Sequence, residues 1–172
     1  MSRKSMKWIG GIILVWFVSA AVGPCTITHK FGPYFGKVVD ETGQPIEGAL
    51  VLKAFYTIRL GGLTHNFVEA LETVTDRNGE FHLAPYRAWV FRFPDQWDPI
   101  ESISIFKPGY RVYSMRYIRS NEYLTIEIPR LRTREDQIKN LREMIYPNIP
   151  REKLKNFLEF EKKARREIGL TQ

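Results

Sequence analysis

At 172 residues with 44% apolar side chains, the chain is long enough for one domain with extensions and rich enough for a packed core. Its formal net charge is +7, and the excess lies at the two ends, because residues 1–21 and 130–172 are net basic while the middle is close to neutral. A local basic region is the electrostatic signature of nucleic-acid binding, but the signs of export at the N-terminus argue against nucleic acid as a partner.

The first 25 residues have the order of a secretory signal: a basic start, an apolar run over residues 8–18 and small residues at 19–21. The apolar run is shorter than the roughly 20 residues of a membrane-spanning helix. Cleavage near Ala21, lipid attachment at Cys25 and an uncleaved anchor all stay open. Cys25 is the only cysteine, so no intrachain disulfide forms, but Pro24 stands where a lipid-attachment site has a small residue. We expect export to the periplasm or cell envelope.

After a short lead-in over residues 26–33, the pattern changes to short strands and turns. Residues 36–40 alternate as a strand does, and residues 41–45 contain the Gly and Pro of a turn. Residues 49–58 are an apolar, β-branched and aromatic run. That run predicts a central strand that is buried on both sides for part of its length.

A second strand–turn–strand unit follows a loop over residues 59–66. Residues 67–75 predict a strand, and residues 76–79 predict a hairpin turn in which Asp76 bonds its own downstream backbone. In the returning strand, residues 80–83, alternation places Phe81 and Leu83 on the buried face.

The aromatic run over residues 86–93 predicts a strand with Trp89, Phe91 and Phe93 facing the core, and Val90 and Arg92 facing the other way. Residues 94–100 contain two prolines and predict a loop that carries Trp97.

Three further strands are predicted at residues 103–106, 111–117 and 124–128, and Pro129 closes the domain. Short strands at this spacing are typical of an antiparallel β-sandwich or barrel.

The last 43 residues predict two helices. Thr133 is placed to cap the first, with an apolar stripe at Ile138, Leu141 and Ile145. The second is expected to begin near Pro150 and to end before Gly169, with a shared apolar face formed by Leu154, Phe157, Leu158 and Ile168. Docking of these helices on the sandwich is the default expectation.

Three blocks of sequence resemble one known family. They are Gly-x-Val-x-Asp with Gly-x-Pro-Ile-x-Gly-Ala-x-Val over 36–51, Thr-Val-Thr-Asp-x-Asn-Gly-x-Phe over 73–81, and Ile-Ser-Ile-Phe-Lys-Pro-Gly-Tyr over 103–110. Together they resemble the carboxypeptidase regulatory-like family. The resemblance implies a transthyretin-like, seven-stranded antiparallel β-sandwich over residues 34–129, followed by the helical basic tail, 130–172. It says little about function, because the family is an accessory module found beside many partners.

The residues do not assemble into a recognisable catalytic or metal motif. His29, His65 and His82 lack the spacing of metal ligands. The acidic residue at the start of the turn over 76–79 is accounted for by the turn itself, so it does not indicate a calcium-binding loop. No serine has a glycine-flanked nucleophile elbow. Hydroxyisourate hydrolases, which share the transthyretin-like fold, end in Tyr-Arg-Gly-Ser, whereas this chain ends in Gly-Leu-Thr-Gln. We therefore expect no catalytic residue, no cofactor and no enzymatic activity.

Two groups of residues are candidates for binding. Tyr86, Trp89 and Trp97 could offer a surface to a protein or a glycan, or the loop could fold back and cover one end of the sandwich. The basic end of the second helix could contact acidic lipid headgroups or a partner; it comprises Lys162, Lys163, Arg165 and Arg166.

The sequence thus predicts a non-enzymatic envelope protein that binds another envelope protein, and membrane attachment through its N-terminus stays open beside signal cleavage. The alternative is a carbohydrate- or peptidoglycan-binding module that uses exposed aromatic residues.

Overall fold

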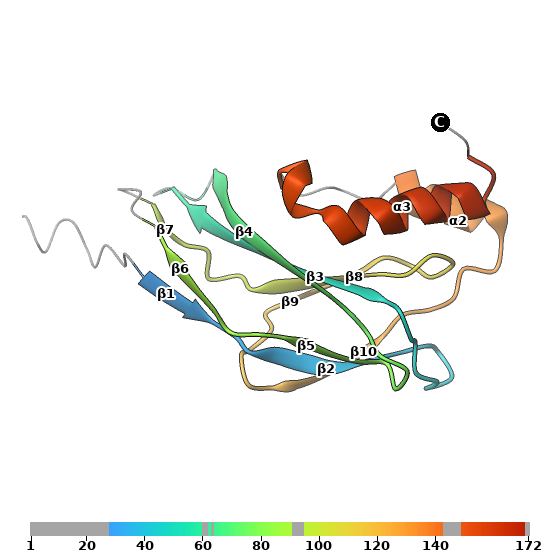
Figure 1. Ribbon diagram of the computed structural model, residues 1–172, viewed down its shortest axis with the longest axis horizontal. Coiled ribbons are helices and arrows are strands. Elements are labelled where there is room, and N and C mark those ends of the chain that lie inside the picture. Colours follow the sequence, from blue (N-terminus) through green and yellow to red (C-terminus); the bar gives the residue numbers. More distant parts are fainter. Residues whose placement is uncertain (1–27, 60–61, 63, 91–94, 143–148, 171–172) are drawn as a thin grey trace, which may run out of the picture.

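A computed structural model of the chain describes residues 28–59, 62, 64–90, 95–142 and 149–170. The predicted signal or anchor segment, including Cys25, lies outside these residues, as do Phe91, Arg92, Phe93 and Ile145. Two β-sheets face each other, and the C-terminal helices cover the outer side of the larger sheet (Figure 1). The predicted mainly-β sandwich with a helical appendage is confirmed.

Ten strands are found in the described residues: β1 (Thr28–Phe31), β2 (Tyr34–Val39), β3 (Leu50–Ile58), β4 (His65–Val74), β5 (Glu80–Leu83), β6 (Tyr86–Trp89), β7 (Gln96–Trp97), β8 (Ser102–Phe106), β9 (Tyr113–Arg116) and β10 (Tyr123–Glu127). The larger sheet has the order β4-β3-β8-β9, with β7 paired to β3, and the smaller has the order β10-β2-β5. A separate two-stranded ribbon consists of β1 and β6. The pairing of β10 with β2 is parallel, and the other pairings are antiparallel.

Strand β3 is buried on both sides, as its sequence predicted. Val51 and Phe55 face the core between the two sheets. Leu50 and Leu52, at the alternate positions, belong to a second core between the larger sheet and the helices. Alternation along one strand therefore supplies two separate hydrophobic cores.

The helices dock on the sandwich through that second core. Helix α2 (Arg134–Arg142) contributes Leu141, and helix α3 (Lys155–Glu167) contributes Phe157 and Ala164, which pack toward Phe106 and its neighbours on the sheet. Thr133 caps α2, since its Oγ1 accepts a hydrogen bond from the N–H of Asp136 at 3.0 Å, as predicted.

Helix α3 begins later than its sequence predicted. Pro150 precedes a short 3-10 turn, η1 (Arg151–Lys153), and the α-helix itself starts at Lys155. Its N-terminus is capped from the sheet: the Glu72 carboxylate on β4 accepts hydrogen bonds from the N–H groups of Asn156 and Phe157, both at 3.0 Å. A negative side chain at this position also favours the helix dipole.

The turn at residues 76–79 is formed as predicted, but it does not make a hairpin. Oδ1 of Asp76 accepts hydrogen bonds from the N–H groups of Asn78 and Glu80, and Gly79 has a φ of 75°. The strands on either side belong to different sheets, since β4 pairs with β3 and β5 pairs with β2. The turn therefore carries the chain from one layer of the sandwich to the other.

Candidate functional site

One end of the sandwich collects aromatic side chains from four strands. Phe31 of β1 lies 4.4 Å from Phe55 and 5.2 Å from Trp97, measured between ring centroids. Tyr86 stacks on Phe55 at 5.3 Å, and His29 lies 5.5 Å from Trp97. Tyr86 and Trp97 are partly buried against the main core. These two predicted binding residues are thus packed side by side with core aromatics.

Trp97 does not lie in a loop, as its sequence predicted. It belongs to strand β7, where it pairs with Thr57 of β3. Gln96 and Trp97, within a proline-bounded segment, extend the larger sheet by pairing with β3. That pairing places Trp97 against core residues that could not be identified from the sequence.

Trp89 faces solvent, and its predicted core position is wrong. It is 71% exposed, while the neighbouring Ala88 is fully buried. The register is set by β1, because His29 lies opposite Ala88 and Thr28 lies opposite Trp89. Residues 26–33 have no clear strand pattern in the sequence, yet residues 28–31 form β1, the strand that decides which face of β6 is buried.

The polar groups near this end pair with one another. Oδ2 of Asp95 accepts hydrogen bonds from Asn66 Nδ2 at 2.7 Å and from Thr57 Oγ1 at 3.2 Å. His65 Nδ1 lies 3.1 Å from Asp98 Oδ2. These contacts join β3 and β4 to the segment around β7. The polar residues at this end therefore have a structural role, which is to hold these strands together.

A charged group lies inside the sandwich. Lys53 of β3 is 2% exposed, and its Nζ lies 3.8 Å from Oε2 of Glu101 and 5.2 Å from the ring centroids of Tyr34 and Phe55. The Tyr34 hydroxyl donates a hydrogen bond to the same Glu101 oxygen. Burial lowers the pKa of Lys53 to about 8, while Glu101 and Asp98 act in the opposite direction. Burial and the Glu101 contact raise the pKa of Tyr34.

Sequence reasoning missed the group formed by Tyr34, Lys53 and Glu101. The available signal was one lysine inside the apolar run over residues 49–58, at a position where alternation points inward. A lysine with a lowered pKa is typical of functional sites, but ion pairs that hold a fold together have the same property. Lys53 is almost fully enclosed, so we assign this group a structural role.

The described residues hold no cluster of three His, Cys, Asp or Glu side chains that could bind a metal ion. His29 lies among aromatic rings, His65 contacts Asp98, and His82 is exposed on β5. Between the β8–β9 turn and the helices is a hollow of about 10 Å³, with room for roughly one water molecule. Lys107, Tyr110 and Asn140 are among its lining residues.

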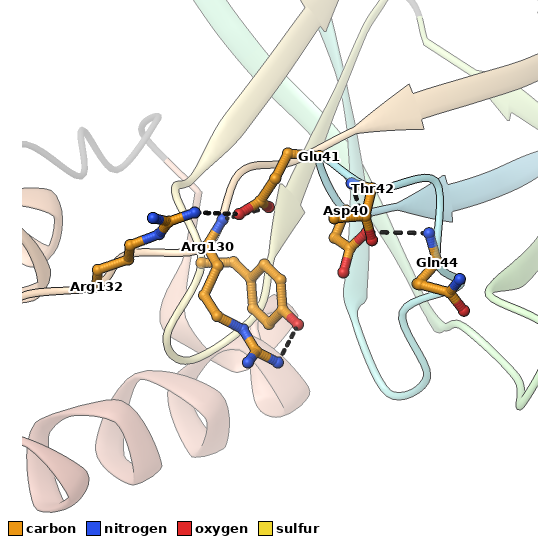
Figure 2. A network of polar contacts seen from close by, with 7 residues as sticks. Asp40, Glu41, Thr42, Gln44, Arg130 and Arg132 are labelled. Carbon is orange, nitrogen blue, oxygen red and sulfur yellow. Dashed lines mark hydrogen bonds and ion pairs between the residues drawn. The ribbon is translucent and has the colours of Figure 1, made fainter.

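The opposite end of the sandwich carries a network of polar contacts (Figure 2). Asp40 closes the turn after β2, because its Oδ1 accepts hydrogen bonds from Thr42 and from the N–H of Gln44. Those bonds hold the pKa of Asp40 below its ordinary value, and the bond from the Thr42 hydroxyl has the largest effect. Glu41 accepts a hydrogen bond from the N–H of Arg130 at 3.0 Å, which joins this turn to the end of the sandwich domain.

The basic end of α3 lies far from the aromatic end. Lys162, Lys163 and Arg166 are exposed, and Arg165 pairs with Glu161 one turn earlier at 2.7 Å. The C-terminal end of α3 and strand β1 stand at opposite ends of the long axis of the molecule (Figure 1). The two groups of predicted binding residues therefore do not form one surface.

No helix in the described part of the chain is long and apolar enough to cross a membrane. The sequence matches no protein-family model, and no curated protein is similar enough to count as a relative. Among solved structures, 3-chlorocatechol 1,2-dioxygenase from Rhodococcus opacus 1CP is similar with 15% identity and a TM-score of 0.36. The match covers 59% of this chain and 61% of that one.

Proposed function

We propose that this chain is an exported, non-enzymatic protein of the cell envelope that binds another envelope protein through its β-sandwich. The export part rests on the order of basic, apolar and small residues in the first 25 positions. The accessory-module part rests on the three blocks of sequence that resemble the carboxypeptidase regulatory-like family.

The aromatic pair on the outer face of the β10-β2-β5 sheet is the observation that carries the proposal. Strand β3 of the larger sheet is covered on both sides, by the main core and by the helices. Within the part of the chain that the structure describes, the smaller sheet is covered only on its inner side. On its outer side Tyr123 is 53% exposed and lies 6.1 Å, between ring centroids, from Phe35.

Polar residues surround that aromatic pair. His82 of β5 lies opposite Phe35, and Lys37 lies between Glu80 and Thr125 in the ladder. An aromatic centre with a polar rim is the usual anatomy of a protein-binding surface. An open sheet face is common in antiparallel sheets, so the support for binding comes from the aromatic pair on it, in which Tyr123 is exposed and Phe35 is half-buried.

The helical tail is less suited to capture the partner. Its apolar side chains, such as Leu154 and Phe157, are already buried against Leu50 and Leu52 of β3. Truncation after Pro129 would uncover this core, so the shortened chain could lose binding simply by unfolding. Surface substitutions are the sharper test.

The test is cross-linking in cells, with a photoreactive amino acid placed at position 123. We expect a specific protein adduct from this position, and we expect Tyr123→Ser in the intact chain to reduce recovery of that protein. Tyr113→Ser is the matched control, because Tyr113 is 38% exposed on β9 of the other sheet. Equal recovery from both variants would contradict the proposed surface.

Glycan binding is the second candidate, and exposed Trp89 is the observation that favours it. Tyr86 and Trp97 are packed among core aromatics, so Trp89 would carry the contact. Retention on isolated peptidoglycan, lost in Trp89→Ala and kept in Tyr123→Ser, would replace protein binding with glycan binding.

A further inference from the structure

The outward face of the β1–β6 ribbon has an unusual composition. Residues directly opposite each other in an antiparallel pair point to the same side. Lys30 lies opposite Arg87, and Thr28 lies opposite Trp89. All four are exposed, while Phe31 and Ala88, at the alternate positions, are buried.

Two cations directly opposite each other repel and weaken a strand pair. Within the described residues, neither Lys30 nor Arg87 forms an ion pair. The indole of Trp89 stands beside them on the same face, with an apolar ring and one N–H group. This face therefore combines unpaired positive charge with an exposed amphipathic ring, which is the combination found at the surface of a lipid bilayer.

The position of the ribbon in the chain adds a second, independent argument. Strand β1 begins at Thr28, two residues after Thr26 and six residues after the end of the apolar stretch that closes at Val22. Fully extended, six residues span at most about 22 Å, so an anchor in that stretch would hold the ribbon close to the membrane. Lipid attachment at Cys25 would hold it closer still.

We propose that the ribbon face formed by Lys30, Arg87 and Trp89 rests on an anionic phospholipid bilayer and orients the sandwich upon it. This inference rests on the export in the proposed function, and it adds attachment of the chain to the membrane through the N-terminal apolar stretch or Cys25. It names a contact distinct from the basic end of α3, which stands at the far end of the long axis (Figure 1).

The attraction is electrostatic and local. Anionic headgroups would neutralise the facing cations, and the indole would enter the headgroup region. Raised salt should weaken the contact, because the screening length falls to about 3 Å at 1 M ionic strength.

The test uses the full chain reconstituted into vesicles that contain phosphatidylglycerol and phosphatidylcholine. Flotation first shows whether the chain is attached. Lysines are then labelled with a water-soluble amine-reactive ester, and the labelled positions are read by mass spectrometry. We expect Lys30 to be protected relative to the detergent-solubilised chain, with Lys162 and Lys163 labelled equally in both.

A second measurement reads the tryptophan. In a variant with Trp8, Trp16 and Trp97 replaced by Phe, emission comes from Trp89 alone. We expect lipids with brominated acyl chains to quench it, and we expect Lys30→Glu with Arg87→Glu to abolish the quenching. Lys162→Glu with Lys163→Glu is the matched control and should leave the quenching unchanged. Circular dichroism verifies that each variant is folded.

The outcomes separate the two proposals. A chain that floats while Lys30 stays reactive and Trp89 unquenched overturns this inference and leaves membrane attachment standing. A chain that does not float overturns membrane attachment and this inference with it, whereas protein binding is tested separately by cross-linking at position 123. Protection that is equally strong in pure phosphatidylcholine contradicts the role of charge and overturns the proposed headgroup contact.

Discussion

The Nζ of Lys53 lies 3.8 Å from Oε2 of Glu101, and the lysine is 2% exposed while the Glu101 side chain is 24% exposed. One charge is enclosed and its partner reaches the surface. Burial has the largest effect on the pKa of Lys53 and lowers that pKa to about 8. The pair therefore holds a buried cation that is costly to keep charged.

The first prediction concerns pH. The folded pKa of Lys53 is below the unfolded value, so the unfolded chain binds more protons between pH 8 and 10. Stability should rise with pH across that interval, by about 2 kcal/mol from Lys53 alone. Lys53→Met should remove this rise. Urea unfolding of both proteins at pH 8 and pH 10 measures the difference, and parallel pH profiles would contradict the buried position.

The second prediction concerns the cap that Glu72 provides to α3. Glu72→Ala leaves the N–H groups of Asn156 and Phe157 without their acceptor. We expect a loss of about 1–2 kcal/mol in the free energy of unfolding, and a smaller loss for Glu72→Gln. Glu159→Ala on the exposed face of α3 is the control and should change little. If the two alanine variants have equal midpoints in urea, the cap contributes nothing.

The third prediction concerns the close approach of β2 and β10. A Cβ on Gly36 would lie 2.0 Å from the carbonyl oxygen of Leu124, a backbone atom that cannot move aside. Gly36→Ala should cost about 3 kcal/mol or more through this clash. Gly43→Ala, with a φ of 79° but no atom within 4 Å, should cost only about 1–2 kcal/mol of backbone strain. Thermal denaturation of both variants ranks them, and the reverse order would refute the parallel pairing.

The fourth prediction concerns acid. The hydrogen bonds to Asp40, led by the Thr42 hydroxyl, lower its pKa in the folded chain. The stability it contributes is present above its unfolded pKa and is lost as pH falls through the folded value. Asp40→Ala should therefore lower the melting temperature at pH 7 and lower it less at pH 3. An equal loss at the two pH values would show that the charge of Asp40 has no part in the effect.

Local patterns predicted much of this fold. The two-sided burial of β3, the Asp76 turn and the Thr133 cap each depend on neighbouring residues, and all three are confirmed. Trp89 shows the limit. Its burial is decided by pairing with β1 across more than fifty intervening residues, and periodicity alone cannot choose between the two faces of β6.

The candidate site was predicted less completely. Tyr86, Trp89 and Trp97 were named from their aromatic character, but only the register separates the exposed ring from the two packed rings. Lys53 went unnoticed because its partner Glu101 is distant in sequence. The aromatic pair of Phe35 and Tyr123 is likewise created by the parallel pairing of strands from the two ends of the domain.

That parallel pairing also governs when the molecule can fold. Strand β2 needs β10 beside it, and β10 lies near the end of the domain, so nearly the whole domain must be synthesised before the smaller sheet can close. Contacts this distant in sequence slow folding. A chain that folds late in its synthesis is still unfolded while it is being made. A translocation channel for unfolded polypeptides requires its substrate in that state.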